Sequence, residues 1–304
     1  MARLVMVLCP PRSFSTLVST MIGQHPDIYG FPELVVMVRE TVGEALRWSR
    51  QREKFLGPPG LLRAMAELMY GSQSAQNVMT AYNWLEDRSD WKSKEVIDFI
   101  MDRAEEVAGT PYCLEKSPVV ATMPVALERI RRAWPDALYI HLTRHPVNFK
   151  TSLDEFIQNL LPHLTEEERQ ARLDRSMSAW PVSQRNIMDF CASLAPGQYI
   201  RIRGEDVLSD GYSVMRQVAE WLGVRTDHEA ISAMLRPEES PYAKLGPMNA
   251  PHGNDPKFIS SPKFRPGAPR LGSLKDYFET VEGRALDPKR QAYLMQLANC
   301  LGYQ

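Results

Sequence analysis

The stretch RLVMVLC at residues 3–9, followed by PPRSFSTL at residues 10–17, decides the fold class. An uninterrupted apolar run of this length is typical of a strand buried on both faces of a parallel sheet. After the short polar loop, apolar residues recur at helical spacing and predict a helix over residues 16–24. A buried strand, a short loop and a helix in this order open an α/β fold.

The rest of the chain continues this alternation of strands and helices. Short apolar runs predict further central strands at residues 112–114, 137–142 and 198–202. Apolar spacing predicts helices at residues 36–50, 60–71, 94–107, 123–133, 147–159, 165–193, 211–222, 227–235 and 287–301. Residues 236–272 are rich in Pro, Gly, Ser and Asn and are expected to form a functional loop. We expect an α/β fold of three layers, with a central parallel sheet flanked by helices, in a single domain over residues 1–304.

Charge, apolar runs and cysteines exclude several classes of protein. The 304 residues hold 36 Lys and Arg against 37 Asp and Glu, a net charge of −1. Such a chain has no global attraction for nucleic acid, so an anion site must be a local cluster of positive groups. No apolar run approaches the ~18 residues that a transmembrane helix needs. The cysteines form no CxxC pair, so we expect reduced thiols, no metal site and a cytoplasmic location; they are Cys9, Cys113, Cys191 and Cys300.

The loop between the first strand and the first helix is a candidate anion site. A helix N-terminus presents backbone N–H groups and the positive end of the helix dipole, and phosphate binds there readily. Arg12 adds a fixed charge, and hydroxyl groups come from Ser13, Ser15 and Thr16. The glycines and the lysine of a Walker A loop are missing. Ordinary capping of a helix by Ser or Thr explains this segment equally well on its own.

A second candidate loop follows the predicted strand at residues 137–142. Arg144 lies at the end of that strand and Ser152 follows eight residues later, so the two can reach one anion. The order of PRSxST-L, HPD at residues 25–27 and RHP with R-x7-S resembles the family of sulfotransferases that use 3′-phosphoadenosine 5′-phosphosulfate (PAPS) and release PAP, the 3′,5′-bisphosphate. The resemblance extends from about residue 4 to residue 222 and implies a P-loop-like fold.

The resemblance also implies how the nucleotide is bound. The first loop would hold the 5′-phosphosulfate, and Arg144 and Ser152 would hold the 3′-phosphate. The RGED segment at residues 203–206 is similar to the family's R-Y-E-D-L, with Gly204 in place of tyrosine, and Phe14 stands where relatives usually carry glycine. The loop at residues 236–272 would close over the nucleotide as a lid; the alternative is a solvated loop that makes no contact with it. The residues expected to bind the nucleotide are Arg12, Ser13, Phe14, Ser15, Thr16, Leu17, Arg144, Ser152, Arg203 and Lys257.

Three residues, Glu33, Lys116 and Arg12, are expected to be catalytic. Glu33 lies near the place of a catalytic glutamate in some relatives and would take the acceptor proton; the alternative is a glutamate in the first turn of a helix. Lys116 resembles a lysine that, alongside Arg12, neutralises the leaving oxygen; the alternative is an exposed pair with Glu115. Because some relatives use a histidine base, two further candidates stay open, His141 and His145.

The sequence therefore predicts a PAPS-dependent sulfotransferase that acts on a hydroxyl of a small-molecule, lipid or carrier-bound acceptor. The helical insertion at residues 34–110 is expected to form the acceptor side. No metal is required where positive side chains and N–H groups supply the charge. One alternative is a P-loop-type small-molecule kinase using ATP, which the missing Walker lysine disfavours. The other is a non-catalytic nucleotide-binding protein.

Overall fold

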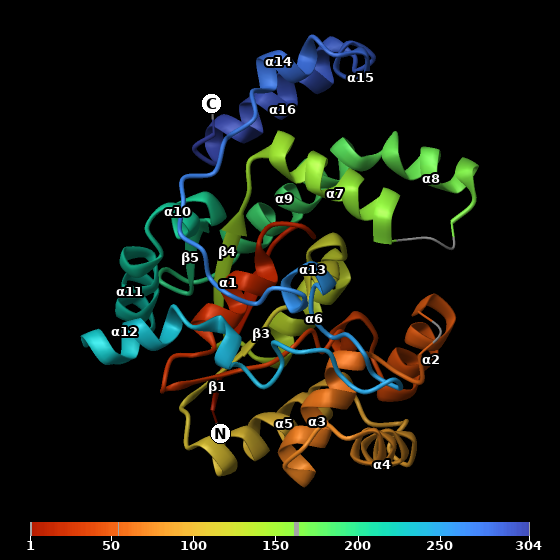
Figure 1. Ribbon diagram of the computed structural model, residues 1–304, viewed down its shortest axis with the longest axis vertical. Helices are drawn as coiled ribbons and strands as arrows, with labels where there is room; N and C mark the ends of the chain where they lie inside the picture. The colour runs from red at the N-terminus through yellow and green to blue at the C-terminus, as the bar shows by residue number, and fades with distance from the viewer. Residues whose placement is uncertain (1, 54, 161–163, 304) are drawn as a thin grey trace.

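A five-stranded sheet forms the centre of the molecule, in a computed structural model that describes residues 2–53, 55–160 and 164–303 (Figure 1). The strand order is β2-β3-β1-β4-β5, and every neighbouring pair is parallel. Four strands match predicted runs, and β2 had not been predicted. The strands are β1 (Arg3–Leu8), β2 (Ile28–Gly30), β3 (Tyr112–Glu115), β4 (Leu138–Thr143) and β5 (Tyr199–Arg203).

Helices cover both faces of this sheet. One face is covered by α1 (Ser15–Ile22), α10 (Gly204–Ser209), α11 (Gly211–Leu222) and α12 (His228–Met234). The other face is covered by η1 (Val36–Val38), α2 (Val42–Glu53), α3 (Pro59–Tyr70), α4 (Ala75–Glu86), α5 (Ser93–Ala108), η2 (Pro118–Thr122) and α6 (Pro124–Ala133). A third hydrophobic cluster joins α7 (Pro146–Leu160), α9 (Ser176–Ala192), α14 (Leu274–Phe278) and α16 (Pro288–Cys300). The remaining helices are α8 (Glu166–Leu173), η3 (Pro237–Glu239), α13 (Pro256–Ile259) and α15 (Val281–Arg284).

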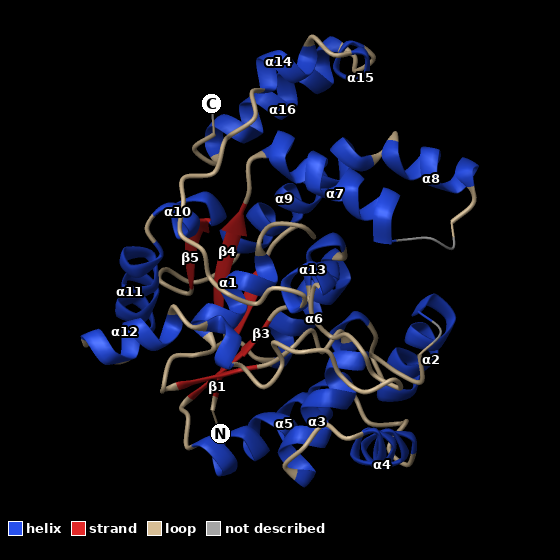
Figure 2. Ribbon diagram, in the orientation of Figure 1, coloured by secondary structure: helices blue, strands red, loops and turns tan. Residues whose placement is uncertain are grey.

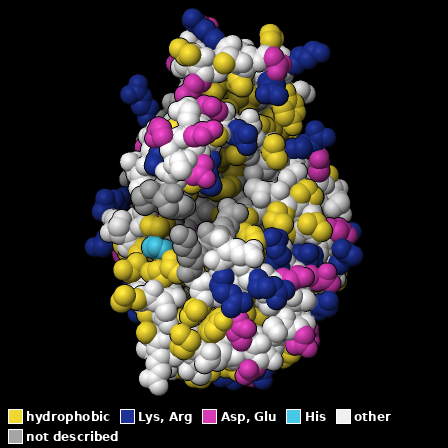
Figure 3. Space-filling model, turned by 90° about the vertical axis from the view of Figure 1, so that its right-hand side faces the viewer, with side chains coloured by type: hydrophobic (Ala, Val, Ile, Leu, Met, Phe, Trp, Pro, Cys, Tyr) yellow, Lys and Arg dark blue, Asp and Glu magenta, His cyan; other side chains and the backbone are white. Residues whose placement is uncertain are grey.

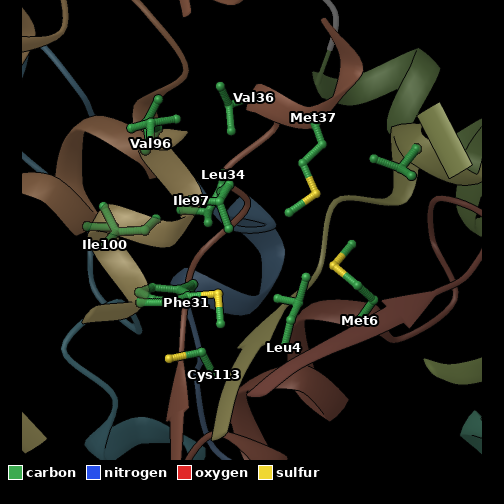
Figure 4. Close-up of a cluster of buried hydrophobic side chains, with 14 of the residues drawn as sticks. Leu4, Met6, Phe31, Leu34, Val36, Met37, Val96, Ile97, Ile100 and Cys113 are labelled. Carbon is green, nitrogen blue, oxygen red and sulfur yellow. The ribbon is translucent and has the colours of Figure 1, made fainter. Parts of the chain in front are cut away.

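The side chains of β1 show why the fold has three layers. Successive residues of a strand point to opposite faces of the sheet. Leu4, Met6 and Leu8 belong to one buried cluster, whereas Val5 and Val7 belong to another. Figure 4 shows part of the first cluster, where side chains from β1 and α5 point toward one another. The sheet is therefore buried between two layers of helices, which confirms the predicted α/β architecture (Figure 2).

Two predicted helices differ from those observed. The helix expected from residue 36 begins instead at Val42, because Val35 has a φ of 59° and the chain turns through η1 first. The helix expected over residues 165–193 is two helices, α8 and α9. The first of these buries none of its side chains, whereas the second buries Met177 and Trp180. The two helices therefore differ in how they pack on the rest of the molecule. Within the described ranges, no helix is both long and apolar enough to cross a membrane.

Residues 240–260, here called the covering segment, lie against α3 and the start of α1. Most of the predicted loop at residues 236–272 is indeed without regular structure, apart from η3 and α13. Arg63 of α3 is fully buried and donates to the carbonyl oxygens of Lys244 and His252, each at 2.9 Å. This burial lowers the pKa of Arg63 to about 10. One buried guanidinium thus anchors the covering segment to the helical layer.

Candidate active site

The loop between β1 and α1 has an unusual backbone. Arg12 has a φ of 64° and Phe14 a φ of 60°, in the left-handed region that residues other than glycine rarely adopt. Such positions cost on the order of 1–3 kcal/mol each and cluster at functional sites. The Ser13 side chain between them is fully buried, and its Oγ has no hydrogen-bond partner in the described part of the chain. The loop therefore holds an unused hydroxyl beside the N-terminus of α1.

Lys116 brings two predicted parts of the site together. It follows β3 directly, and its side chain is 0% exposed. Its Nζ donates to Thr16 Oγ1 at 2.8 Å and to Glu33 Oε1 at 2.5 Å. The Glu33 side chain keeps 29% of its surface exposed. Both alternative interpretations of these residues are wrong, because Lys116 is neither exposed nor paired with Glu115, and Glu33 lies well before the start of α2.

Residues 33–35 and 115–117 run side by side as paired segments. Beside the Lys116–Glu33 ion pair, Glu115 Oε1 accepts a hydrogen bond from the backbone N–H of Leu34 at 3.1 Å. Ser117 Oγ accepts one from the N–H of Val35 at 3.0 Å and donates to Glu115 Oε1. Burial raises the pKa of Glu115 to about 7. Three successive contacts thus hold Glu33 against Lys116.

The second loop meets the first across β4 and α7. Arg144 donates a hydrogen bond to the carbonyl oxygen of Arg12. The Nε of Arg12 lies 3.4 Å from Ser152 Oγ, and the Arg12 guanidinium also lies over the ring of Phe156. Burial lowers the pKa of Arg144 to about 10. The two loops that the sequence linked to opposite ends of one nucleotide are therefore in direct contact.

An unpredicted carboxylate lies against the first loop. Asp255, in the covering segment, forms an ion pair with Arg12 at 2.9 Å. Its backbone N–H points to Thr16 Oγ1 at 3.3 Å, and its side chain caps α13 by accepting from the N–H of Lys257. The Asp-Pro pair at residues 255–256 is a typical helix start, but this local signal cannot reveal the contact with Arg12.

Two predicted nucleotide residues have other partners here. Arg203 donates to both carboxylate oxygens of Asp206 through Nε and Nη2, and its Nη1 donates to the carbonyl oxygen of Gly302 at 2.9 Å. Lys257 is 69% exposed and pairs with Glu155 of α7 at 3.2 Å. Of the predicted residues, those joined around the first loop are Arg12, Thr16, Glu33, Lys116, Arg144 and Ser152.

The candidate histidine bases are enclosed in the fold. His141 is fully buried, its Nε2 lies 2.7 Å from Gln184 Oε1, and burial lowers its pKa to about 4. His145 is buried, and its Nδ1 accepts from the N–H of Val147 at 3.3 Å. Both rings thus have local partners, as residues that shape a strand and a turn do.

The residues of the two loops fit a polyanion. Positive charge converges from Arg12, Lys116 and Arg144, and the α1 N-terminus adds its dipole. Besides Ser13 Oγ, Arg144 Nε is buried and has no hydrogen-bond partner among the residues that the structure describes. A bound phosphate or sulfate would satisfy such donors. No group of three His, Cys, Asp or Glu residues in the described ranges is arranged to hold a metal.

Comparisons with known proteins show the family to which the chain belongs. The chain is similar to a sulfotransferase domain from the curacin biosynthetic pathway, with 24% identity and a TM-score of 0.72 over 100% of this chain and 99% of that chain. A sulfotransferase domain from the olefin synthase of Synechococcus PCC 7002 gives 22% identity and a TM-score of 0.73 over 100% and 97%. No curated protein matches the sequence. Residues 5–228 match the model of the sulfotransferase family, and since this is most of the chain, the protein belongs to that family.

Proposed function

We propose that this sulfotransferase takes the sulfuryl group from PAPS and transfers it to a hydroxyl oxygen of a small-molecule, lipid or carrier-bound acceptor. The observation that carries the proposal is the position of Lys116 Nζ between Thr16 Oγ1 and Glu33 Oε1. It joins the loop proposed to hold the phosphosulfate to the carboxylate proposed as the base. Membership of the sulfotransferase family decides against the alternative of an ATP-dependent kinase.

The chemistry needs one base and a charged environment for the leaving group. PAPS supplies a sulfuryl group whose sulfur the acceptor oxygen attacks, while the bond from sulfur to the bridging phosphate oxygen breaks. Glu33 takes the acceptor proton on Oε2, because Oε1 is engaged by Lys116. An ammonium group has three donors, and Thr16 and Glu33 account for two of those on Lys116. The third, with Arg12, stabilises the negative charge on the leaving PAP.

Arg144 and Ser152 are proposed to bind the 3′-phosphate. Their contacts with Arg12 place them beside the first loop, and the partnerless Nε of Arg144 supports the assignment. Ser13, Phe14, Ser15 and Leu17 complete the proposed nucleotide loop. The roles predicted for Arg203 and Lys257 remain predictions, since their present partners are other residues of the chain.

The acceptor class rests on the shape of the molecule and on its neighbours. Figure 3 views the side of α2 and α8, where hydrophobic side chains gather in a hollow and Lys and Arg are interspersed with Asp and Glu. An uncharged or carrier-bound hydroxyl compound suits this face better than an acidic peptide does. The solved relatives from the curacin pathway and the olefin synthase belong to biosynthetic systems, which supports such an acceptor.

The cellular location and the domain organisation also remain proposals. All four cysteines are free, and three of them are buried, which supports a reducing compartment such as the cytoplasm. The single domain over residues 1–304 stays a prediction.

Two measurements test the proposed function. In the first, the protein is incubated with PAPS and a panel of alcohols, hydroxylated lipids and hydroxyacyl thioesters, and PAP release is followed. We expect PAP release that depends on one acceptor class. Transfer of phosphate from ATP, or tight PAP binding with no turnover on any acceptor, would contradict the proposal.

The second measurement addresses the 3′-phosphate. Binding of PAP and 5′-AMP is compared by thermal shift, since a ligand at a hundredfold its Kd stabilises the folded state by about 2.7 kcal/mol. Arg144→Ala is expected to weaken PAP far more than 5′-AMP, while the exposed control Arg236→Ala should change neither. An equal loss for both ligands in Arg144→Ala would refute the assignment of Arg144.

A further inference from the structure

We infer that Phe14 is a positioning residue that holds the Arg144 guanidinium at the 3′-phosphate site, and that the glycine at position 204 exists to make room for it. The inference rests on the proposed role of Arg144 and gives a specific role to the ring of Phe14, which the proposed function names only as part of the nucleotide loop. It concerns the two places where the sequence departs from the pattern of its relatives, which turn out to be in contact with each other.

The ring of Phe14 lies against Arg144. The centre of the Arg144 guanidinium is 4.1 Å from the ring centroid, well within the range of a cation–π contact. Such contacts gain strength when the cation is desolvated, and burial lowers the pKa of Arg144 to about 10. In this arrangement the backbone of Phe14 has a φ of 60°. A strained backbone at a residue whose ring packs on a buried cation indicates that the contact is functional.

Gly204 lies on the other side of the ring. A Cβ at this position would lie 2.4 Å from Phe14 Cδ2 and 3.3 Å from Cγ. The φ of Gly204 is not in the left-handed region, so glycine is required here for space and not for backbone conformation. Any side chain at position 204 must therefore displace the ring of Phe14. Because α10 begins at Gly204, the helix start after β5 and the helix start after β1 pack against each other through one aromatic ring.

This packing connects the two phosphate loops. The Phe14 carbonyl oxygen accepts the N–H of Val18 in the first turn of α1, while the Phe14 ring contacts the arginine of the second loop. Arg144 in turn donates to the carbonyl oxygen of Arg12. Removing the ring leaves the first loop intact but frees the guanidinium to sample other rotamers. Phe14→Gly should therefore weaken binding of the 3′-phosphate selectively.

The test is a double-mutant cycle of wild type, Phe14→Gly, Gly204→Ala and the double variant, with Kd for PAP and for 5′-AMP measured by calorimetry. We expect the preference for PAP over 5′-AMP to fall about tenfold in Phe14→Gly. The same fall is expected in Gly204→Ala, with no further fall in the double variant. Glycine suits a φ of 60°, so Phe14→Gly should fold, and the double variant shows whether alanine at 204 is tolerated once the ring is gone.

Three outcomes would overturn the inference. An unchanged PAP to 5′-AMP preference in Phe14→Gly would show that the ring does not position Arg144. Equal losses from Gly204→Ala with and without Phe14 would show that the two positions are not coupled. A wild-type protein that binds PAP and 5′-AMP equally would remove the 3′-phosphate site itself, and with it both this inference and the proposed role of Arg144.

Discussion

Two regions at the same end of the sheet are held in different ways. One carries the residues proposed to react, and the other is the segment that covers them. The paired segments 33–35 and 115–117 are joined by three consecutive contacts, in which Glu115, Lys116 and Ser117 are all buried. The covering segment is held by the Arg63 guanidinium, by a hydrogen bond from the Glu33 N–H to the Gly253 carbonyl oxygen at 2.7 Å, and by the buried Tyr242, whose hydroxyl lies 2.9 Å from that of Tyr29. Its contact with Arg12 is the ion pair of Asp255, whose side chain is 24% exposed. The reacting groups thus sit on strand ends, whereas the cover depends on a few long-range contacts.

Loss of the Arg63 guanidinium should have the largest effect on stability. Arg63→Met keeps the apolar stem but leaves the carbonyl oxygens of Lys244 and His252 without their donor, at a cost of about 4 kcal/mol. Because the lost donors bind residues 244 and 252, the loss of stability should appear in the covering segment first. We expect amide hydrogen exchange over residues 244–253 to speed up in Arg63→Met relative to wild type, by more than exchange in the sheet does. Unchanged protection there, with the exposed Arg216→Met as control, would break the comparison.

Lys116 tests the rigid side of the comparison. Lys116→Met preserves the buried stem and removes the ammonium group, so kcat should fall by about a hundredfold to a thousandfold. The affinity for PAP should fall much less, because Arg12 and Arg144 remain. Transfer assays and PAP titration check both numbers, with the exposed Lys92→Met as control. A drop in PAP affinity as large as the drop in kcat would mean that Lys116 serves binding alone.

Glu115, in the paired segments, should make the stability of the protein depend on pH. Folding raises the pKa of this carboxyl from its ordinary 4.5 to about 7, so over that interval the folded protein keeps a proton that the unfolded chain has released. Stability must therefore fall as the pH rises from about 4.5 to about 7, by about 3 kcal/mol from this group. Glu115→Gln keeps the acceptor for Leu34 and should flatten this part of the curve. The free energy of unfolding is measured by denaturation between pH 4.5 and 8 for wild type and Glu115→Gln. An identical dependence on pH in both proteins would contradict the assignment.

Asp255 should have the smallest effect. Its carboxylate neutralises Arg12 at the edge of the proposed phosphosulfate site, through a partly exposed pair worth about 0.2–1 kcal/mol. Asp255→Asn removes that competing charge, so PAP should bind about twofold to fivefold more tightly. Calorimetry beside the exposed control Asp90→Asn measures the change. Weaker binding in Asp255→Asn would show instead that the carboxylate orients Arg12 for the nucleotide.

Much of the fold could be predicted because buried parallel strands are continuous apolar runs. The runs at residues 3–9 and 137–142 both became central strands. Ile28–Gly30 escaped because a strand of three residues carries no periodic signal. The start of α2 was misplaced because the chain turns at Val35, which has a positive φ and whose N–H donates to Ser117, 82 positions away in the sequence.

The candidate site could be predicted only where its residues carry a motif or follow an apolar run. Glu33 was singled out by the family resemblance, and Lys116 by the resemblance together with its place after a short apolar run; the structure brings them together. Asp255 could not be predicted for two reasons. It lies in a segment that shows no periodicity, and its contact partner Thr16 is 239 residues away in the sequence. The role of Gly204 was equally hidden, because only the tertiary packing shows that Phe14 fills its space.

The central claim is that Glu33 is the base of a PAPS-dependent transfer, and a single variant tests it most directly. Glu33→Gln keeps the size of the side chain and an oxygen for Lys116 but cannot take a proton. Turnover with PAPS and PAP affinity are measured together, beside the exposed control Glu238→Gln. We predict that Glu33→Gln binds PAP like wild type and loses turnover by about a hundredfold or more. Wild-type turnover in Glu33→Gln would contradict the account.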